Sequence, residues 1–308
     1  MSRAVSLTLL LVMSGAPACA QERTSGPTAS SRTPTTTRAT ESAAEIPRRP
    51  TSAAEAARQI QRALRIVKDT EATADEIAWA GHAEQLAVRE IVAHPRWLPR
   101  VLDDLDASMR TQTRDNVTAR LAFRSMHPSA PSELADELPA WRILAPPPAL
   151  ILKGFYREAE RRYGVDWEYL AAIHLVETAF GRIRGTSVAG AQGPMQFMPT
   201  TWDIYGNGGD INDPHDAILA AARLLRANGF SRDKAAALYR YNNSSAYVRG
   251  VSLHAGVMQR RPRALLGFHS WQVYYLTQRG GVWLEEGYAT RHPIPVDRYL
   301  ERHPEALR

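Results

Sequence analysis

The stretch that decides the fold begins at Glu177-Thr-Ala-Phe-Gly181 and continues to Gly193-Pro-Met-Gln-Phe-Met-Pro199. Glu177 follows Leu170 and Ile173 at a spacing that places all three on one helix face. The sequence therefore predicts a helix over about residues 167–180, with a carboxylate on its apolar stripe.

This position disfavours the charged form of Glu177. Burial among apolar side chains penalises an ionised carboxylate, and the negative end of the helix dipole adds to that penalty. We therefore expect a raised pKa and a side chain able to donate a proton near neutral pH. The alternative for Glu177 alone is an ordinary ion pair with Arg182 or Arg184.

Residues 181–194 form a predicted loop because four glycines with small polar neighbours favour a close approach by other groups. Pro199 is expected to begin a short helix that reaches Tyr205. Together, residues 177–205 offer an acid on an apolar stripe, amides, thioethers and aromatic rings, which suit a sugar polymer. The alternative for the Met and aromatic side chains is core packing.

These segments resemble the lytic transglycosylases that cleave bacterial peptidoglycan, with the closest resemblance to the branch around membrane-bound lytic transglycosylase B and its actinobacterial-type relatives. Besides the stretch at 177–202, residues 210–225 resemble the helix that follows in that family. Residues 237–248 resemble its Tyr-Asn motif, and the resemblance covers roughly 148–260. Three ordered motifs at family spacing are more specific than any one of them.

The resemblance implies a role for each matching residue. Glu177 corresponds to the sole catalytic acid/base. Ser187, Met195 and Gln196 correspond to residues that line the sugar cleft, and Tyr241 and Asn242 to the motif that faces it. The wider family usually has Ser where this chain has Thr178, and Leu where it has Pro194.

The implied reaction cleaves the β-1,4 bond between N-acetylmuramic acid and N-acetylglucosamine with one carboxylic acid and forms a 1,6-anhydromuramyl end. Most glycosidases use two carboxylates, so a second one among Asp203, Asp210, Asp213 and Asp216 would favour hydrolysis. Asp213 precedes Pro214 and is expected to cap a helix instead. A muramidase that hydrolyses the same bond, and a peptidoglycan-binding protein without turnover, remain the alternatives.

No cofactor or metal is expected. Residues 206–210 lack the spaced acidic ligands of an EF-hand, although some relatives hold calcium nearby. His174 lies beside the apolar stripe and is expected to be a packed histidine.

The chain has 308 residues, a net charge of +6 and one cysteine, Cys19. Its 44% of hydrophobic residues excludes wholesale disorder, and no run is long enough for a membrane span. Residues 1–20 resemble a secretory signal, cleaved either before Gln21 or at a lipobox that would lipidate Cys19. We expect export to the bacterial cell envelope, with glycan strands rather than nucleic acid as the partner of a monomer.

The predicted fold is mainly α, with a lysozyme-like catalytic domain of the goose-type lysozyme and soluble lytic transglycosylase kind at 148–265. A Ser/Thr/Pro-rich linker at 21–52 and a helical region at 53–147 precede it. Alternating apolar residues around Gln278-Arg-Gly-Gly281 predict a C-terminal β-hairpin tail at 266–308.

Overall fold

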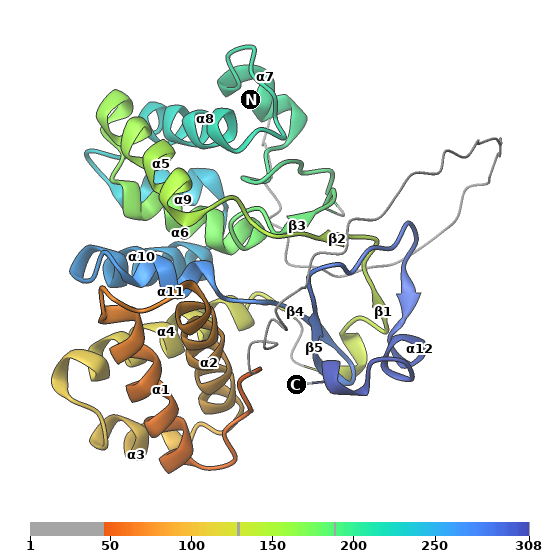
Figure 1. Ribbon diagram of the computed structural model, residues 1–308. Coiled ribbons are helices and arrows are strands. Elements are labelled where there is room, and N and C mark those ends of the chain that lie inside the picture. Colours follow the sequence, from red (N-terminus) through yellow and green to blue (C-terminus); the bar gives the residue numbers. More distant parts are fainter. Residues whose placement is uncertain (1–45, 128–129, 188, 308) are drawn as a thin grey trace, which may run out of the picture.

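The computed structural model describes residues 46–127, 130–187 and 189–307. The predicted export segment with Cys19 and most of the predicted linker lie outside this part of the chain. The fold is mainly helical with short antiparallel strand pairs, as predicted. Helices α1–α4 form one layer, α5–α9 form another, and α10 and α11 lie between them (Figure 1). Among the described residues, no helix is both long and apolar enough to cross a membrane.

The first layer consists of α1 (Ala53–Lys68), α2 (Ala74–Ala93), α3 (Trp97–Asp103) and α4 (Ala107–Arg124). Thr73-Ala-Asp-Glu76 has the sequence pattern of a capping box, and that box is present at the start of α2, since Thr73 and Glu76 each bind the other's backbone N–H. Asp106 caps α4 through the N–H of Met109 at 2.8 Å. This cap begins α4 and separates it from α3.

The second layer contains residues 177–199, the stretch that decides the fold. Its helices are α5 (Ala149–Tyr163), α6 (Trp167–Thr178), α7 (Pro199–Tyr205), α8 (Pro214–Ala227) and α9 (Lys234–Tyr241), followed by α10 (Ser245–Arg260) and α11 (Ala264–His269). Helix α6 is buried on nearly all sides between α5, α8 and α10. It therefore forms the centre of the core, and a polar side chain on it is held away from solvent.

Helix α10 joins the two layers, because it packs against α4 on one side and α6 on the other. Gly250 makes the contact with α4 close, since a Cβ there would lie 2.3 Å from the ring of Phe123. A larger residue would push the layers apart. The layer of α1–α4 therefore supports α10 and α6, the two helices that carry the candidate site.

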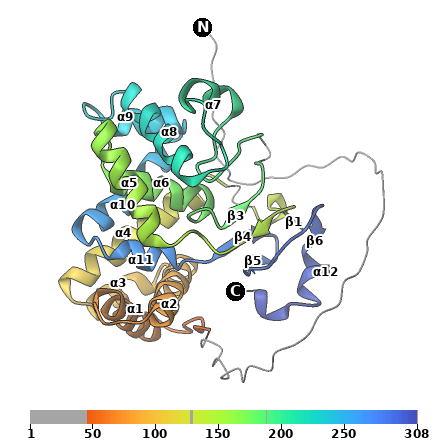
Figure 2. The same ribbon diagram turned by 45° about the horizontal axis from the view of Figure 1, so that its top comes forward.

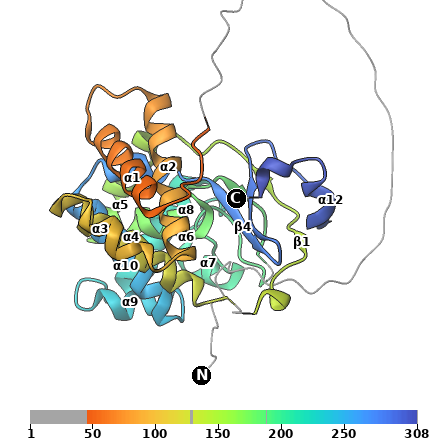
Figure 3. The same cartoon turned by 90° about the horizontal axis from the view of Figure 1, so that it is seen from below.

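The strands and α12 (Val296–Leu300) lie to one side of the helices (Figures 2 and 3). The predicted hairpin is present as β4 (Val273–Thr277) and β5 (Gly280–Leu284). A segment from before α5 also contributes a strand to this part of the molecule. Its strand β1 (Glu137–Leu138) pairs with β6 (Ile294–Pro295). In addition, β2 (Arg142–Ile143) pairs with β3 (Ile183–Arg184).

This arrangement corrects two expectations. In the described part of the predicted helical region 53–147, residues 134–143 form short strands and irregular chain instead of helix. They contribute Leu138, Trp141 and Ile143 to an apolar core shared with β4 and β5. Pro293-Ile-Pro-Val-Asp297 has a sequence that predicts an extended segment, but the chain turns into α12 after the two strand residues of β6. The tail therefore packs with the end of the N-terminal region as one small β subdomain.

Candidate active site

Helix α6 ends abruptly at the candidate acid. Ala179, Phe180 and Gly181 follow with φ values of 50°, 63° and 81°, all in the left-handed region. Ala179 and Phe180 pay a conformational cost there that glycine does not. The hydroxyl of Thr178 stabilises this turn, since it donates to the carbonyl of Pro194 at 2.6 Å and accepts from the N–H of Gly181 at 3.0 Å. The turn thus fastens the end of α6 to the loop that follows.

Glu177 is only 3% exposed and lies in the last turn of α6. Its Oε1 accepts a hydrogen bond from the hydroxyl of Tyr247 at 2.7 Å. Burial raises the pKa of Glu177 from 4.5 to about 8, and the Tyr247 hydrogen bond partly opposes that rise. The direction matches the sequence prediction. Glu177 can therefore hold a proton at neutral pH.

The ion-pair alternative for Glu177 does not hold. Arg182 donates to the carbonyl of His269 at 3.2 Å and lies 3.7 Å from the carboxylate of Glu286. Arg184 lies on β3, where it lines a separate cleft. Neither cation therefore holds the carboxylate of Glu177 in its charged form.

Tyr247 is the residue that the sequence analysis missed. It is fully buried in the first turn of α10, and its ring stacks on that of Tyr241 with centroids 6.4 Å apart and an interplanar angle of 5°. Burial raises the pKa of both phenols well above 10, so each remains a hydrogen-bond donor. Tyr241 donates to the carbonyl of Met195 at 2.6 Å. The two rings thus link the end of α6, the Met195 loop and the end of α9.

The predicted cleft residues fall into two groups. Met195 and Tyr241 are buried in the core. Ser187 accepts a hydrogen bond from the N–H of Ala191 at 2.8 Å and so braces its own loop. These three side chains contribute to the scaffold around Glu177.

Gln196 and Asn242 are also buried, but each keeps an amide atom unpartnered within the described part of the chain. For Gln196 that atom is Oε1, an acceptor, and for Asn242 it is Nδ2, a donor. Gln196 has a left-handed backbone with φ 49° and donates through Nε2 to the carbonyl of Gly193 at 2.9 Å. Gly193 is required there because a Cβ would lie 1.9 Å from the carbonyl oxygen of Ile211. The loop and the residue that follows α9 therefore each present one unsatisfied amide atom, and a ligand bound there would relieve its desolvation cost.

His174 is packed as expected. It is fully buried, its Nδ1 lies 2.7 Å from the hydroxyl of Tyr156, and burial lowers its pKa to about 3. It is therefore neutral and has no charge to supply at neutral pH.

Of the candidate second carboxylates, Asp203 lies exposed on α7, and the other three lie around the start of α8. Asp213 caps α8 through the N–H of Asp216 at 3.0 Å, as predicted. Asp216 in turn accepts from the N–H of Asp210 at 3.0 Å. With His215 between them, Asp213 and Asp216 offer ligand atoms within 4.8 Å of one another. We assign no metal to this group, because both carboxylates already serve backbone N–H groups.

Residues 154–256 match the family model described as Transglycosylase SLT domain. The matched segment runs from α5 to α10 and includes every residue of the candidate site. No curated protein and no solved structure matches the chain.

Proposed function

Since residues 154–256 form a transglycosylase SLT domain, we propose that this chain is a lytic transglycosylase that cleaves the β-1,4 bond between N-acetylmuramic acid and N-acetylglucosamine in peptidoglycan. The observation that carries the proposal is the buried carboxyl of Glu177, hydrogen-bonded to Tyr247 at 2.7 Å, with a pKa raised to about 8. A protonated acid at neutral pH is what protonation of a glycosidic oxygen needs.

In the first step Glu177 donates its proton to the glycosidic oxygen, and the bond from that oxygen to C1 of the muramic acid breaks. The substrate's acetamido group stabilises the positive charge that develops at C1. The hydroxyl of Tyr247 stabilises the carboxylate left on Glu177, since a hydrogen bond to the charged form lowers its free energy.

In the second step the carboxylate of Glu177 takes the proton of the muramic C6 hydroxyl, whose oxygen closes onto C1. Glu177 is thereby reprotonated, and the product is a 1,6-anhydromuramyl end without consumption of water. The nucleophile belongs to the substrate, so proximity replaces the second carboxylate of most glycosidases.

We propose that Gln196 and Asn242 contact the sugar directly, because each has a buried amide atom without a protein partner. Sugar hydroxyl and acetamido groups are suitable partners for an amide oxygen and an amide N–H. For Ser187, Met195 and Tyr241 the proposed contribution is indirect, through the shape of the loop and the hydrogen bond that anchors it.

We place the protein in the bacterial cell envelope, where peptidoglycan is found, and take 148–265 as the catalytic unit. Residues 1–20 direct its export and leave Cys19 either removed or lipidated. We also propose that the protein belongs to the branch around membrane-bound lytic transglycosylase B and its actinobacterial-type relatives, and that it acts as a monomer.

Digestion of purified peptidoglycan sacculi in oxygen-18-labelled water tests the reaction type. A transglycosylase releases anhydromuramyl fragments that carry no label. A muramidase would release reducing ends that contain one labelled oxygen, and a binding protein would release nothing. Either of the last two results would overturn the proposal.

A further inference from the structure

A cleft of about 950 Å³ opens between the loop after α6 and the β subdomain. Its cationic lining consists of three arginines from three separate chain segments: Arg142 on β2, Arg184 on β3 and Arg291 in the turn before β6. Arg142 and Arg291 lie outside the matched segment 154–256. The β subdomain therefore adds positive charge to a cleft that the SLT domain forms only in part.

The fold forces two of these arginines together. The register of the β2–β3 pair sets Arg142 directly opposite Arg184. Like charges in that relation destabilise a strand pair. The pKa of Arg184 is lowered by burial and by the charge of Arg142, which reflects the same repulsion.

The third arginine is held nearby. Ala289 forms a bridge with Arg142, and the N–H of Thr290 donates to the carbonyl of Trp141 at 3.0 Å. Within the part of the chain that the structure describes, no carboxylate lines the cleft and no ion pair involves any of the three guanidinium groups. The cleft is thus an uncompensated cationic site, of the kind that binds an anion.

The cleft adjoins the candidate active site through one loop. Gly193 lines it, and the carbonyl of Gly193 accepts from Gln196 at 2.9 Å. The next residue, Pro194, receives the hydroxyl of Thr178, the neighbour of Glu177 in the chain. A substituent on a sugar bound at Glu177 therefore has a short path into the cleft.

We infer that the arginine cleft binds the carboxylates of the peptide stem attached to muramic acid, so that the enzyme prefers stem-bearing glycan over bare glycan. This inference rests on the proposed function. The glycan backbone offers mainly neutral hydroxyl and acetamido groups, for which three cations are not needed. Stem carboxylates match the planar fork of a guanidinium group, which binds both carboxylate oxygens.

The test compares three soluble substrates of matched chain length. The first is glycan with intact stems. The second is glycan freed of stems by an amidase, with the lactyl carboxylate that the amidase leaves on each muramic acid converted to its amide. The third carries stems whose carboxylates have been amidated. The wild-type protein is expected to have its highest kcat/KM on the first substrate. Equal kcat/KM on all three, or a preference for the bare or amidated glycan, would overturn the inference.

The variants are Arg142→Ala, Arg291→Ala and Arg142→Lys. Each alanine substitution should reduce the ratio of kcat/KM on stem-bearing glycan to that on bare glycan about tenfold, the effect of one lost charge-assisted contact. Arg142→Lys should restore only part of the ratio, because lysine lacks the fork. Because the result is a ratio on one protein preparation, a general loss of folded enzyme does not alter it.

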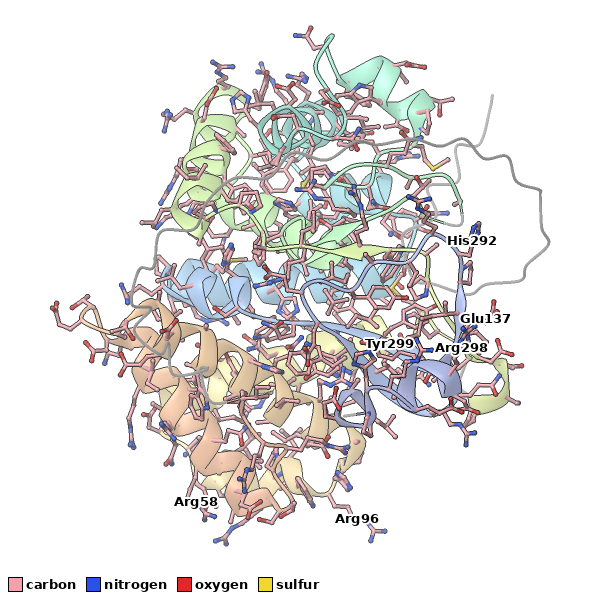
Figure 4. The ribbon with its side chains drawn as sticks, turned by 45° about the vertical axis from the view of Figure 1, so that its right-hand side comes forward. Arg58, Arg96, Glu137, His292, Arg298 and Tyr299 are labelled. Atoms are coloured by element: carbon pink, nitrogen blue, oxygen red, sulfur yellow. The ribbon has the colours of Figure 1, made fainter. Side chains whose placement is uncertain are left out.

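Arg58→Ala is the matched control, since it removes the same charge from an exposed position on α1. Arg58 lies at the opposite end of the molecule from His292, the neighbour of Arg291 (Figure 4). An unchanged ratio in the Arg142 and Arg291 variants, or the same fall in Arg58→Ala, would refute the inference. The proposed function would fail separately, if the wild-type protein cleaved none of the three substrates.

Discussion

Two buried carboxyl groups, in different layers of the molecule, have much the same electrostatic description. Glu177 on α6 and Glu84 on α2 are each 3% exposed. Burial raises the pKa of Glu177 to about 8 and that of Glu84 to about 7. Judged by exposure and pKa alone, both are candidates for a general acid.

Their surroundings differ. Glu84 Oε1 accepts from the amides of Gln112 and Asn116, both at 2.9 Å and both on α4, so it forms a closed polar contact between two packed helices. Glu177 lies in the last turn of α6, which ends in a left-handed turn beside a loop that itself holds the left-handed residue Gln196. A raised pKa therefore indicates burial, and it is the open, strained loop beside the carboxyl that distinguishes a reaction site from a structural contact.

Replacing each carboxyl by its amide should separate the two most sharply. Glu177→Gln should lower the rate of soluble muropeptide release by about 10³-fold, because it removes the proton donor. Glu84→Gln should stay close to the wild-type rate, since its amide oxygen still accepts from Gln112 and Asn116. Release is measured from purified sacculi at equal concentrations of folded protein. If the rate of release fell by a similar factor in both variants, Glu177 could not be distinguished from Glu84 as the reacting acid.

The two carboxyls should be alike in their effect on pH-dependent stability. In the folded protein each holds a proton that the unfolded chain releases above its ordinary pKa of 4.5. Their contribution to stability is therefore complete below about 4.5, and it is lost as pH rises to about 7 for Glu84 and about 8 for Glu177. Between about pH 5 and about pH 8, Glu84→Gln should lose roughly 2 kcal/mol less stability than wild type, and Glu177→Gln roughly 3 kcal/mol less, because the pKa of Glu177 is raised further.

Urea unfolding at the two pH values measures this difference. The exposed Glu301→Gln serves as the control and should follow the wild-type protein. If Glu177→Gln lost as much stability as wild type on going to the higher pH, Glu177 would not be held protonated by the fold.

The phenol beside Glu177 provides a finer test. Tyr247→Phe removes a hydrogen bond that lowers the pKa of Glu177, so the pKa should rise by about one unit. Because activity needs the protonated acid, the high-pH limb of the pH–rate profile should move to higher pH. The rate below that limb should fall, since the ionised form of Glu177 loses its donor.

Tyr241→Phe is the matched control for Tyr247→Phe. It deletes an equally buried hydroxyl that donates to Met195 instead of Glu177. We expect it to lower stability and to leave the position of the high-pH limb in place. A limb that moved equally in both variants would assign the effect to general loosening of the core.

The smallest expected effect concerns Glu84. Asn116→Ala should destabilise the protein by about 1 kcal/mol, because Glu84 loses one of its two donors. The loss is limited because Asn116 Oδ1 is itself buried without a partner in the described structure. Thermal unfolding measures the change, and the rate of muropeptide release should be unaltered. A fall in that rate would connect Glu84 to the reaction.

Local patterns were enough to predict much of the fold. The helical spacing that ends at Glu177, the capping box at Thr73 and Glu76, and the hairpin at 273–284 each depend on residues close together in the chain. The pairing of β1 with β6 could not be predicted, because two-residue strands 156 positions apart carry no periodicity.

The same limit applies to the site. The acid and its raised pKa follow from one helix, whereas the Tyr247 hydrogen bond joins residues 70 positions apart. The orientation of Met195 into the core depends on left-handed conformations at Gly193 and Gln196, which the sequence suggests only through the glycine. The candidate sugar-contacting residues therefore follow from the family resemblance. The structure separates those that form the scaffold from Gln196 and Asn242, which have unpartnered polar atoms.

A carbon-13 NMR titration of the Glu177 side-chain carboxyl, assigned by its absence in Glu177→Gln, tests the central claim most directly. The claim is that burial keeps this one acid protonated at neutral pH so that it can serve as proton donor. The predicted result is a titration midpoint near 8. A midpoint near the ordinary value of 4.5 would mean that the carboxyl is ionised at neutral pH, and would contradict the account.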